Sequence, residues 1–248
     1  MRRLLTLIAL IALTGMLSFG SLVASAQESP LAGRWQITIV FANAREHKIQ
    51  FDALGSGAGT LLLLDEVSNL NPPASLNKAE WKGETSAQFA LSGDVEFPIG
   101  NVGVDAGTLH FEGTVNTPDS ISGTVTFTRK VSGQITQQGS FTADRTPVPT
   151  LRMLSLNKGK KVKRGRVVNI EWKFEGASPV KKQQVSLSLD GGETFVPLSP
   201  IIEDGSNSYE WIVGPTQAKT RLALVRITVI DQTSAVTFDV CDKTFRIK

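Results

Sequence analysis

The chain has 248 residues, of which 41% are hydrophobic, and a chain of this length can supply two separate hydrophobic cores. Its formal net charge of +3 falls to +1 if Arg2 and Arg3 leave with the N-terminal segment, so the overall charge is no argument for nucleic-acid binding. Cys241 is the only cysteine, which excludes an intrachain disulfide. It stands in a strand-like run, and we expect a small buried core residue rather than a reactive thiol.

The first 26 residues have the three parts of a secretory signal peptide. Met1-Arg2-Arg3 is a short basic start, 4–17 is almost unbroken apolar sequence, and Ala24-Ser25-Ala26 is a cleavage site of small residues. The apolar stretch is shorter than the roughly 20 residues that span a bilayer, and no later segment has such a run. We therefore expect a signal peptide over 1–26, no transmembrane segment and a secreted protein, periplasmic or extracellular. The lack of an N-x-S/T sequon favours a bacterial source.

Two modules are expected to meet near Pro147. The segment 146–149 has proline at alternate positions, which favours extended backbone with few hydrogen bonds. Residues 27–146 hold 8 basic and 13 acidic residues, a net charge of −5, whereas residues 147–248 hold 16 and 10, a net charge of +6. Such asymmetry is typical of separate folding units. We therefore predict one domain over 27–146 and a second over 147–248.

The first module is predicted to be an antiparallel meander of about eight strands. Apolar and polar residues alternate, which gives each strand one apolar face, around 35–41, 49–51, 61–64, 81, 89–91, 109–115, 121–127 and 141. Such strands remove their exposed edges by closing into a β-barrel. Gly113 and Gly123 suit the sharp bends or close backbone approaches of a small barrel. The longest connection, 65–78, either shapes a barrel mouth or is an ordinary surface loop.

Gly33-Arg34-Trp35, at the start of the first strand, resembles the G-x-W motif that opens lipocalin-like and avidin-like barrels, the calycins. The resemblance implies that Trp35 closes the floor of the barrel and that a late basic residue, Arg145 or Arg129, packs over it. The sequence departs from both families, since it has no lipocalin C-terminal helix and no recognisable set of biotin-site residues. The resemblance therefore implies a barrel shape and says little about a ligand.

The interior of such a barrel is either packed solid or holds one small ligand. In the first case the aromatic residues of the strands are core, namely Trp35, Phe41, Phe51, Trp81, Phe111 and Phe127. In the second case the candidate ligand-binding residues are Trp35, His47 and Trp81. His47 belongs to this set because it is in phase with the apolar residues that follow it in its strand.

The second histidine, His110, is out of phase with its apolar neighbours and is expected to face solvent beside Glu112. Neither histidine has another His, Cys or carboxylate at metal-ligand spacing in its own strand. We therefore predict no metal site and no cofactor.

The second module has short alternating strands over 165–172, 185–189, 209–213, 226–229 and 244–247. Their order resembles the immunoglobulin-like and fibronectin-III-like modules of bacterial secreted and surface proteins, over nearly all of 148–248. The resemblance implies a β-sandwich that serves as a spacer or adhesion unit. Ile170 and Trp172 are expected on the inner face of one sheet, against 185–189 and 225–229 of the other. The predicted fold class is therefore all-β, a barrel followed by an Ig-like sandwich.

The segment Ser188-Leu189-Asp190-Gly191-Gly192-Glu193-Thr194-Phe195 matches the Asp-box hairpin of sialidase-type propellers. A propeller would need several copies at blade spacing, and this chain has one. Asp190-Gly191 is a turn signal between alternating strands. We therefore interpret the segment as a structural hairpin turn.

Six basic residues fall within nine positions of the second module: Lys158, Lys160, Lys161, Lys163, Arg164 and Arg166. A basic loop of this kind binds acidic polysaccharide, lipopolysaccharide phosphate or another anionic cell-surface component, and the alternative is a solvated hairpin that keeps the module soluble. Nucleic acid is the least favoured partner because no aromatic residues for base stacking are interleaved.

Catalytic signatures are absent from the sequence: it has no G-x-S-x-G, H-E-x-x-H or G-x-x-x-x-G-K motif. We therefore predict that the protein is not an enzyme. The expected function is that of a secreted or envelope binding, adhesion or structural protein whose basic loop contacts anionic surface polymers. The alternative is a small-molecule carrier that uses the interior of the barrel.

Overall fold

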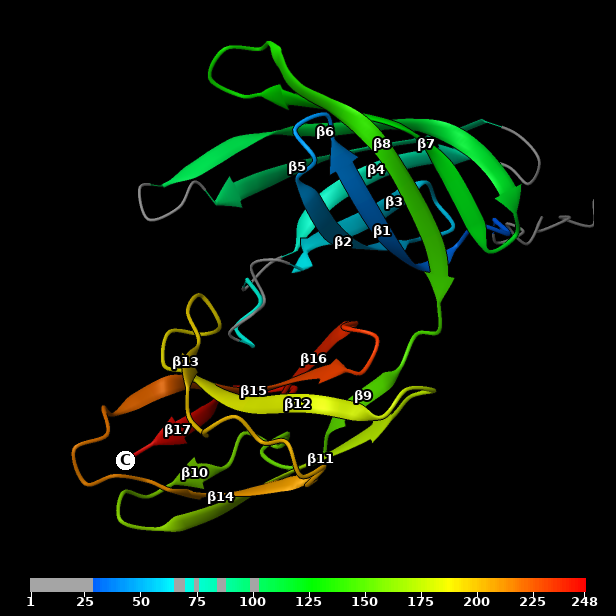
Figure 1. Ribbon diagram of the computed structural model, residues 1–248. Helices are drawn as coiled ribbons and strands as arrows, with labels where there is room; N and C mark the ends of the chain where they lie inside the picture. Colours follow the sequence, from blue (N-terminus) through cyan, green and yellow to red (C-terminus); the bar gives the residue numbers. More distant parts are fainter. Residues whose placement is uncertain (1–28, 65–69, 74–75, 84–87, 99–102) are drawn as a thin grey trace, which may run out of the picture.

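The computed structural model describes residues 29–64, 70–73, 76–83, 88–98 and 103–248, so the signal peptide predicted over 1–26 lies outside the described residues. Figure 1 shows a barrel lying above a second body of packed sheets. The described residues form strands, turns and loops with no α-helix, and the all-β fold class is confirmed. Accordingly, no helix in the described part of the chain is long and apolar enough to cross a membrane.

Eight strands build the barrel: β1 (Gly33–Phe41), β2 (Glu46–Ala53), β3 (Ala58–Leu63), β4 (Asn77–Gly83), β5 (Gln88–Pro98), β6 (Val104–Thr117), β7 (Ser120–Arg129) and β8 (Ile135–Thr146). Each strand pairs with the next in the chain, and β8 returns to pair with β1 from Arg34↔Thr146 to Phe41↔Gly139. This last pairing leaves no open edge in the sheet. The prediction of a closed antiparallel meander of about eight strands is therefore confirmed.

The interior of the barrel is filled by the inward side chains of all eight strands. Trp35, Ile37 and Ile39 of β1 are at most 1% exposed, because alternate residues of a strand face the same side. The six aromatic residues expected to be core are all buried: Trp35, Phe41, Phe51, Trp81, Phe111 and Phe127. Aromatic rings also touch across strands, with centroids 5.2 Å apart for Phe97–Phe127 and 5.1 Å for Phe111–Phe141. These rings stabilise the barrel through burial and edge-to-face packing.

Two glycines let neighbouring barrel strands come close together. Gly113 of β6 and Gly123 of β7 face each other in register. A Cβ atom added to Gly123 would lie 2.1 Å from the Glu112 carbonyl oxygen and 2.4 Å from the Gly113 Cα. No side chain fits at that distance, so the predicted close backbone approach is confirmed.

The second body is a sandwich of two sheets. Its strands are β9 (Thr150–Met153), β10 (Lys161–Val162), β11 (Val167–Glu175), β12 (Val180–Ser188), β13 (Val196–Pro197), β14 (Ser208–Ile212), β15 (Thr220–Asp231), β16 (Val236–Val240) and β17 (Phe245–Ile247). One sheet has the order β10-β17-β15-β12-β13, with β16 paired to β15, and the other has the order β14-β11-β9.

The sandwich core lies where the sequence pattern placed it. Ile170 and Trp172 of β11 are at most 1% exposed, and they share one core cluster with Val185 of β12 and with Val225 and Ile227 of β15. The two sheets therefore bury opposing apolar faces, as expected for a β-sandwich.

Polar contacts join the barrel to the sandwich. Arg34 of β1 donates to the Asp52 carboxylate at 2.7 and 2.9 Å, and its Nη1 donates to the Val236 carbonyl oxygen at 3.2 Å and to Thr237 Oγ1 at 3.0 Å. Gln50 Oε1 accepts from the Val236 N–H at 3.0 Å. A small apolar cluster is formed by Leu62, Leu70, Ile230 and Val236. These contacts attach the outer face of β1–β3 to the hairpin of β15 and β16.

Arg226 makes a second attachment from the sandwich side. Its side chain is 1% exposed, and it donates to the Pro72 carbonyl oxygen at 2.9 Å and to Asn71 Oδ1 at 2.5 Å. Its guanidinium lies over the rings of Phe195 and Phe238, 4.0 and 5.8 Å from their centroids. Burial lowers the pKa of Arg226 to about 10. The described part of the 65–78 connection thus packs against the sandwich, a role that the sequence did not indicate.

Candidate functional site

Trp35 and Trp81 lie at one end of the barrel and His47 lies toward the other. Trp35 is paired in register with Phe51, whereas His47 is paired with Ile39, four residues further along β1. Four residues of a strand span about 13 Å. The barrel residues proposed for a ligand therefore form no single cluster.

The floor of the barrel is closed by Trp35 and Arg145. Trp35 Nε1 donates to the Leu31 carbonyl oxygen at 2.9 Å, and the Arg145 guanidinium lies over the indole at 4.6 Å from its centroid. Arg145 also donates to the Ala32 and Pro30 carbonyl oxygens at 2.7 and 2.6 Å. Of the two candidates, Arg145 is thus the basic residue that packs over Trp35, and Arg129 is paired with an acidic residue elsewhere on the barrel.

The polar atom of Trp81 is engaged in structural contacts, and the His47 ring packs among aromatic residues. Trp81 Nε1 donates to the backbone oxygens of Leu54 and Ala58 at 3.1 and 3.0 Å. His47 is 7% exposed, and its ring centroid lies 4.5 Å from that of Phe97 and 5.8 Å from that of Phe41. As expected, His110 is exposed on the outer face.

The six basic residues of the 158–166 run surround the edge strand β10. All six are exposed, and within the run only Val162 is buried. Lys161 pairs in register with Arg246 of β17. The run therefore lies next to the C-terminal strand rather than in an isolated loop.

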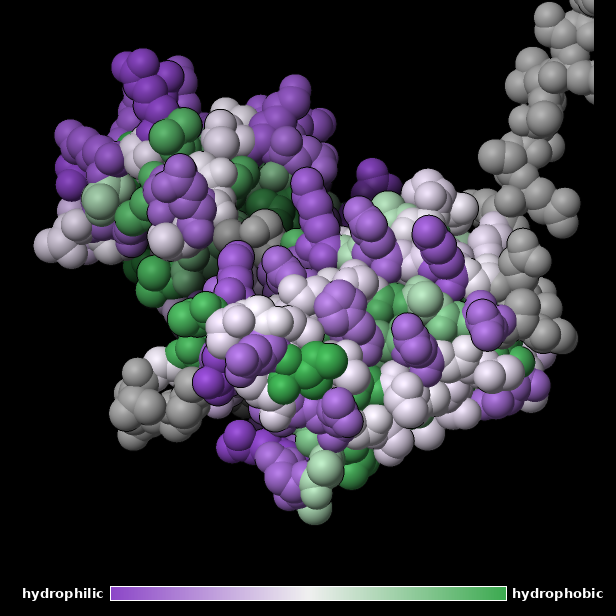
Figure 2. Space-filling model, turned by 90° about the horizontal axis from the view of Figure 1, so that it is seen from above, coloured by the Kyte–Doolittle hydropathy of each residue, from purple (hydrophilic) through white to green (hydrophobic). Residues whose placement is uncertain are grey.

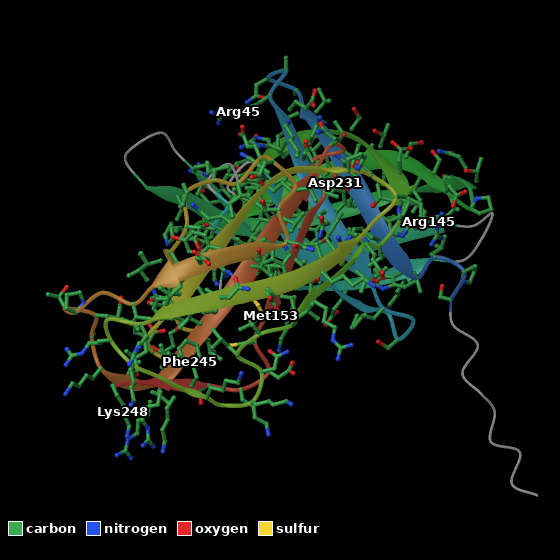
Figure 3. All side chains as sticks on the ribbon, turned by 90° about the horizontal axis from the view of Figure 1, so that it is seen from below. Arg45, Arg145, Met153, Asp231, Phe245 and Lys248 are labelled. Atoms are coloured by element: carbon green, nitrogen blue, oxygen red, sulfur yellow. The ribbon has the colours of Figure 1, made fainter. Side chains whose placement is uncertain are left out.

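Four further cations are brought to the same place by β15 and β17: Lys219, Arg221, Arg246 and Lys248. The Lys248 N–H donates to the Val162 oxygen at 3.0 Å, and the Arg164 N–H donates to the Lys248 oxygen at 3.2 Å. Figure 3 shows nitrogen-tipped side chains gathered around Lys248. We call these ten residues the basic edge. Sequence reasoning missed the last four because 50 or more positions separate them from the run, and only the +6 charge of the module hinted at them.

Carboxylates do not neutralise the basic edge. Among the described residues none of its ten cations takes part in an ion pair, although ion pairs occur elsewhere in the same part of the chain. Figure 2 shows the part of the sandwich that the barrel leaves uncovered, in the upper left of the view, where hydrophilic side chains dominate the outline. The uncompensated charge makes this edge a focus of positive potential.

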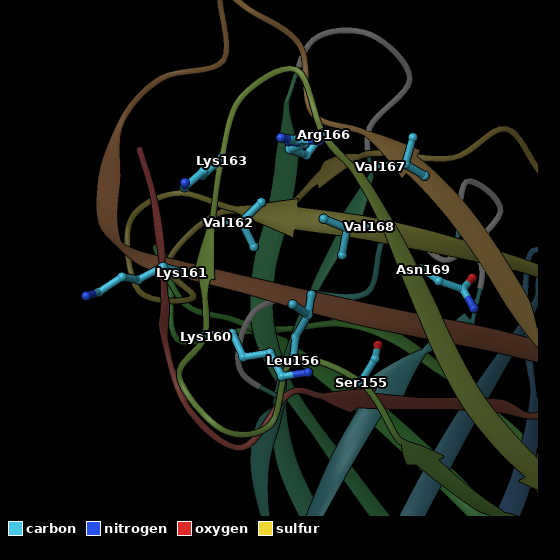
Figure 4. A pocket seen from close by; sticks show the side chains of 10 residues that line it. All are labelled: Ser155, Leu156, Lys160, Lys161, Val162, Lys163, Arg166, Val167, Val168 and Asn169. Carbon is cyan, nitrogen blue, oxygen red and sulfur yellow. The ribbon is translucent and has the colours of Figure 1, made fainter.

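A groove of about 390 Å³ runs between β10 and β11 (Figure 4). Leu156, Val162 and Val168 give it an apolar floor, while Lys163 and Arg166 lie together at one end of it. Lys161 points away from the groove (Figure 4). A second concavity of about 470 Å³ is lined by Lys219, Thr220, Arg221, Arg246, Ile247 and Lys248. The basic edge can therefore offer hydrogen-bond donors to an anionic ligand on both sides of β10.

The Asp-box segment forms the turn that connects β12 to β13. The Asp190 carboxylate accepts hydrogen bonds from Ser188 and Thr194, which lower its pKa well below the usual range. Gly191 and Gly192 have φ values of 85° and 101°, the left-handed region that glycine tolerates. The segment therefore has the internal bonding of a structural turn between antiparallel strands, as predicted.

No cluster of three metal-ligating side chains occurs in the described ranges of the chain. Cys241 is 3% exposed in the sandwich core, and burial raises the pKa of its thiol. The prediction that this cysteine is a buried core residue is confirmed.

No protein-family model matches the chain, and neither does any curated protein. A solved structure of the fibronectin(III)-like modules of CbhA from Clostridium thermocellum is similar over 68% of this chain and 92% of that chain, at 12% sequence identity and a TM-score of 0.30. A likeness at this score assigns neither a family nor an activity to this chain.

Proposed function

We propose that the protein is exported and binds anionic polymers of a cell surface, without catalysis, through the basic edge of its sandwich. The observation that carries the proposal is the gathering of ten cations, from strands distant in the sequence, with no ion pair among the described residues. Like charges on neighbouring strands destabilise a sheet. A bound polyanion would offset this repulsion, so the cluster of cations is explained if the protein binds such a polymer.

The charge of the two modules favours one orientation at an anionic surface. The barrel residues carry a net charge of −5 and the sandwich residues +6. Figure 1 places β10 and β17 on the side of the sandwich away from the barrel. An approaching molecule would therefore be steered with the basic edge forward and the acidic barrel outward, an effect that salt screens.

The carrier alternative has less support. The described interior of the barrel is occupied by aromatic rings in contact, so a ligand could enter only if those rings moved apart. A carrier would show tryptophan fluorescence that responds to its ligand.

Retention on immobilised heparin, a polysulfated polymer, tests the proposal. The wild-type protein should bind at low salt and elute at raised salt, because its contacts are charge-assisted and screened. Neutralising Lys160, Lys161, Lys163 and Arg164 to glutamine should move elution to clearly lower salt. Unchanged retention of this variant would contradict the proposal.

A matched variant controls for the loss of four positive charges. It also carries four glutamine substitutions, at exposed lysines away from the basic edge: Lys78, Lys82, Lys130 and Lys181. If net charge alone governs retention, the two variants elute together. If the basic edge binds the polymer, the control elutes near the wild type.

A further inference from the structure

The strand register arranges part of the basic edge as a regular array. Strands β10 and β17 are parallel, with Lys161 beside Arg246 and Val162 beside Ile247. The next pair in this register is Lys163 beside Lys248. It is held by the backbone hydrogen bonds from Lys248 to Val162 and from Arg164 to Lys248, at 3.0 and 3.2 Å. Lys161 thus stands beside a cation of β17, and Lys163 stands beside the lysine that follows this strand.

Strand β15 extends both pairs into rows of three. Thr220 is the register partner of Ile247 in this antiparallel pair. Arg221 therefore stands beside Arg246, and Lys219 stands beside Lys248. The register shifts between Thr220 and Ala223, so this part of β15 presents an extra residue next to Arg246.

Alternation along the strands places Lys161, Arg246 and Arg221 on the outer face of the sheet, and Lys163, Lys248 and Lys219 are exposed one residue beyond the ends of the same three strands. Val162 and Ile247 are 5% and 1% exposed and face the core. Residues on either side of them in an alternating strand face outward. We call these six cations the cation grid: Lys161, Arg246 and Arg221 in one row, and Lys163, Lys248 and Lys219 in the other. Neighbouring strands lie about 5 Å apart and the rows about 7 Å apart.

Such a grid is unfavourable for the fold on its own. Directly opposed like charges destabilise a sheet, and among the described residues no carboxylate pairs with any of the six. The second concavity, of about 470 Å³, lies among four of these cations and can receive an anionic group. The stability of the fold therefore does not explain why the six charges lie together, whereas binding of a polyanion does.

An acidic hairpin borders the grid on its far side. The Gly191 N–H donates to the Leu222 oxygen at 3.0 Å, so the hairpin that carries Asp190 and Glu193 lies next to the end of the rows. Asp190 is held in its ionised form by the hydrogen bonds that lower its pKa. An anionic chain is repelled on that side and is directed over β10 toward the groove and Arg166.

We infer that the cation grid is the main docking platform for an acidic polysaccharide that carries a negative group on every sugar unit, laid across β15, β17 and β10. This inference rests on the proposed function and names the partner of the same site. Two rows of cations at these spacings can meet successive acid groups of a densely charged chain at once. A chain with acid groups on alternate sugars would satisfy only part of the grid.

The test compares two triple variants of the whole protein. The grid variant carries Arg221→Gln, Arg246→Gln and Lys248→Gln, all outside the sequence run, and the loop variant has three glutamines within it, at Lys158, Lys160 and Arg166. The probes are polygalacturonate, with a carboxylate on every sugar, and hyaluronan, with one on every second sugar. Binding is measured by calorimetry at low salt, and circular dichroism checks the fold.

The grid variant should bind polygalacturonate about tenfold or more weakly than wild type, and the loop variant should lose less, because each lost charged contact contributes about a factor of several. Wild type should prefer polygalacturonate to hyaluronan. A grid variant that binds like wild type, while the loop variant fails to bind, would overturn the inference and leave the proposed function standing. Wild-type protein that binds neither polymer nor heparin would overturn both.

A second measurement is independent of any ligand. Arg246 lies between Lys161 and Arg221 in its row, so Arg246→Gln removes two repulsive neighbours at once. The variant should have a higher melting temperature than wild type at low salt, and the difference should disappear at high salt, where the charges are screened. A melting temperature that falls at low salt would show that the grid is not repulsive.

Discussion

Replacing Arg226 should weaken the attachment between barrel and sandwich more than any other single change at that contact. The residue is almost fully buried, and it donates hydrogen bonds to the backbone of Pro72 and the side chain of Asn71. Its guanidinium carbon lies 4.0 Å from the centroid of the Phe195 ring. Arg226→Ala removes all of these contacts, whereas Arg226→Met keeps most of the side-chain volume without the donors.

The contacts of Arg226 set the magnitude. The buried Pro72 oxygen left without a donor costs about 1–3 kcal/mol, the Asn71 oxygen costs less because that residue is exposed to water, and the lost stacking on Phe195 costs about 2 kcal/mol. Removing the cation also removes its desolvation cost, which is the cause of its lowered pKa and offsets several kcal/mol of the loss. On balance, we expect Arg226→Ala to lower the free energy of unfolding by about 3 kcal/mol. The loss for Arg226→Met should be smaller than this by about 1–2 kcal/mol, because methionine leaves no large cavity.

Urea unfolding followed by tryptophan fluorescence measures this effect. Trp81 reports on the barrel and Trp172 on the sandwich, since each is buried in one of the two cores. Limited proteolysis in the 147–149 segment gives a second readout, because this linker, which is already exposed at Val148, is held less rigidly once the contact is loosened. A loss below about 1 kcal/mol for Arg226→Ala, with unchanged proteolysis, would refute the view that this residue joins the two bodies.

Three further changes test the fold in other places. Arg145→Ala should lower the free energy of unfolding by about 3 kcal/mol and shift the fluorescence emission of Trp35 at the barrel floor. Arg129→Ala breaks only an exposed ion pair, so in the same urea titration it should cost less than about 1 kcal/mol. Gly123→Ala should lower the melting temperature strongly, with a cost of about 2 kcal/mol or more, because its Cβ has no room, while Gly214→Ala meets nothing within 4 Å and should be nearly neutral. The hydrogen bonds that lower the pKa of Asp190 stabilise the fold above the ordinary aspartate pKa of about 4, and this stabilisation is lost as the pH falls toward the lowered value. The difference in urea midpoint between wild type and Asp190→Asn should therefore shrink between about pH 6 and about pH 3, and a constant difference would contradict the assignment.

The barrel could be predicted from the sequence because its signal is local. Alternation of apolar and polar residues around Trp35 or Phe111 depends only on which face of one strand is buried. The close glycine pair, Gly113 and Gly123, lies in consecutive strands joined by a short turn, so its partners were also near in sequence. The choice between Arg145 and Arg129 could not be made in this way, because it depends on the register in which β8 closes against β1, which pairs Arg145 with Trp35.

The contacts between distant segments could not be predicted. Arg226 meets Asn71 across 155 positions, and no periodicity in either segment indicates that meeting. The same reason hid four of the six members of the cation grid: Lys161 and Lys163 belong to a visible basic run, but the other four lie 50 or more positions away from it, at 219, 221, 246 and 248. Only the register of β10, β17 and β15 places them side by side.

Mapping of a bound polymer by backbone amide NMR tests the central claim most directly. Short polygalacturonate chains are titrated into the labelled protein at low salt. Binding at the basic edge predicts that the amides of 158–166, 219–222 and 245–248 shift together and that the shifts are reversed by added salt. Shifts confined to the barrel, around Trp35, His47 or Trp81, or no shifts at all, would contradict the account.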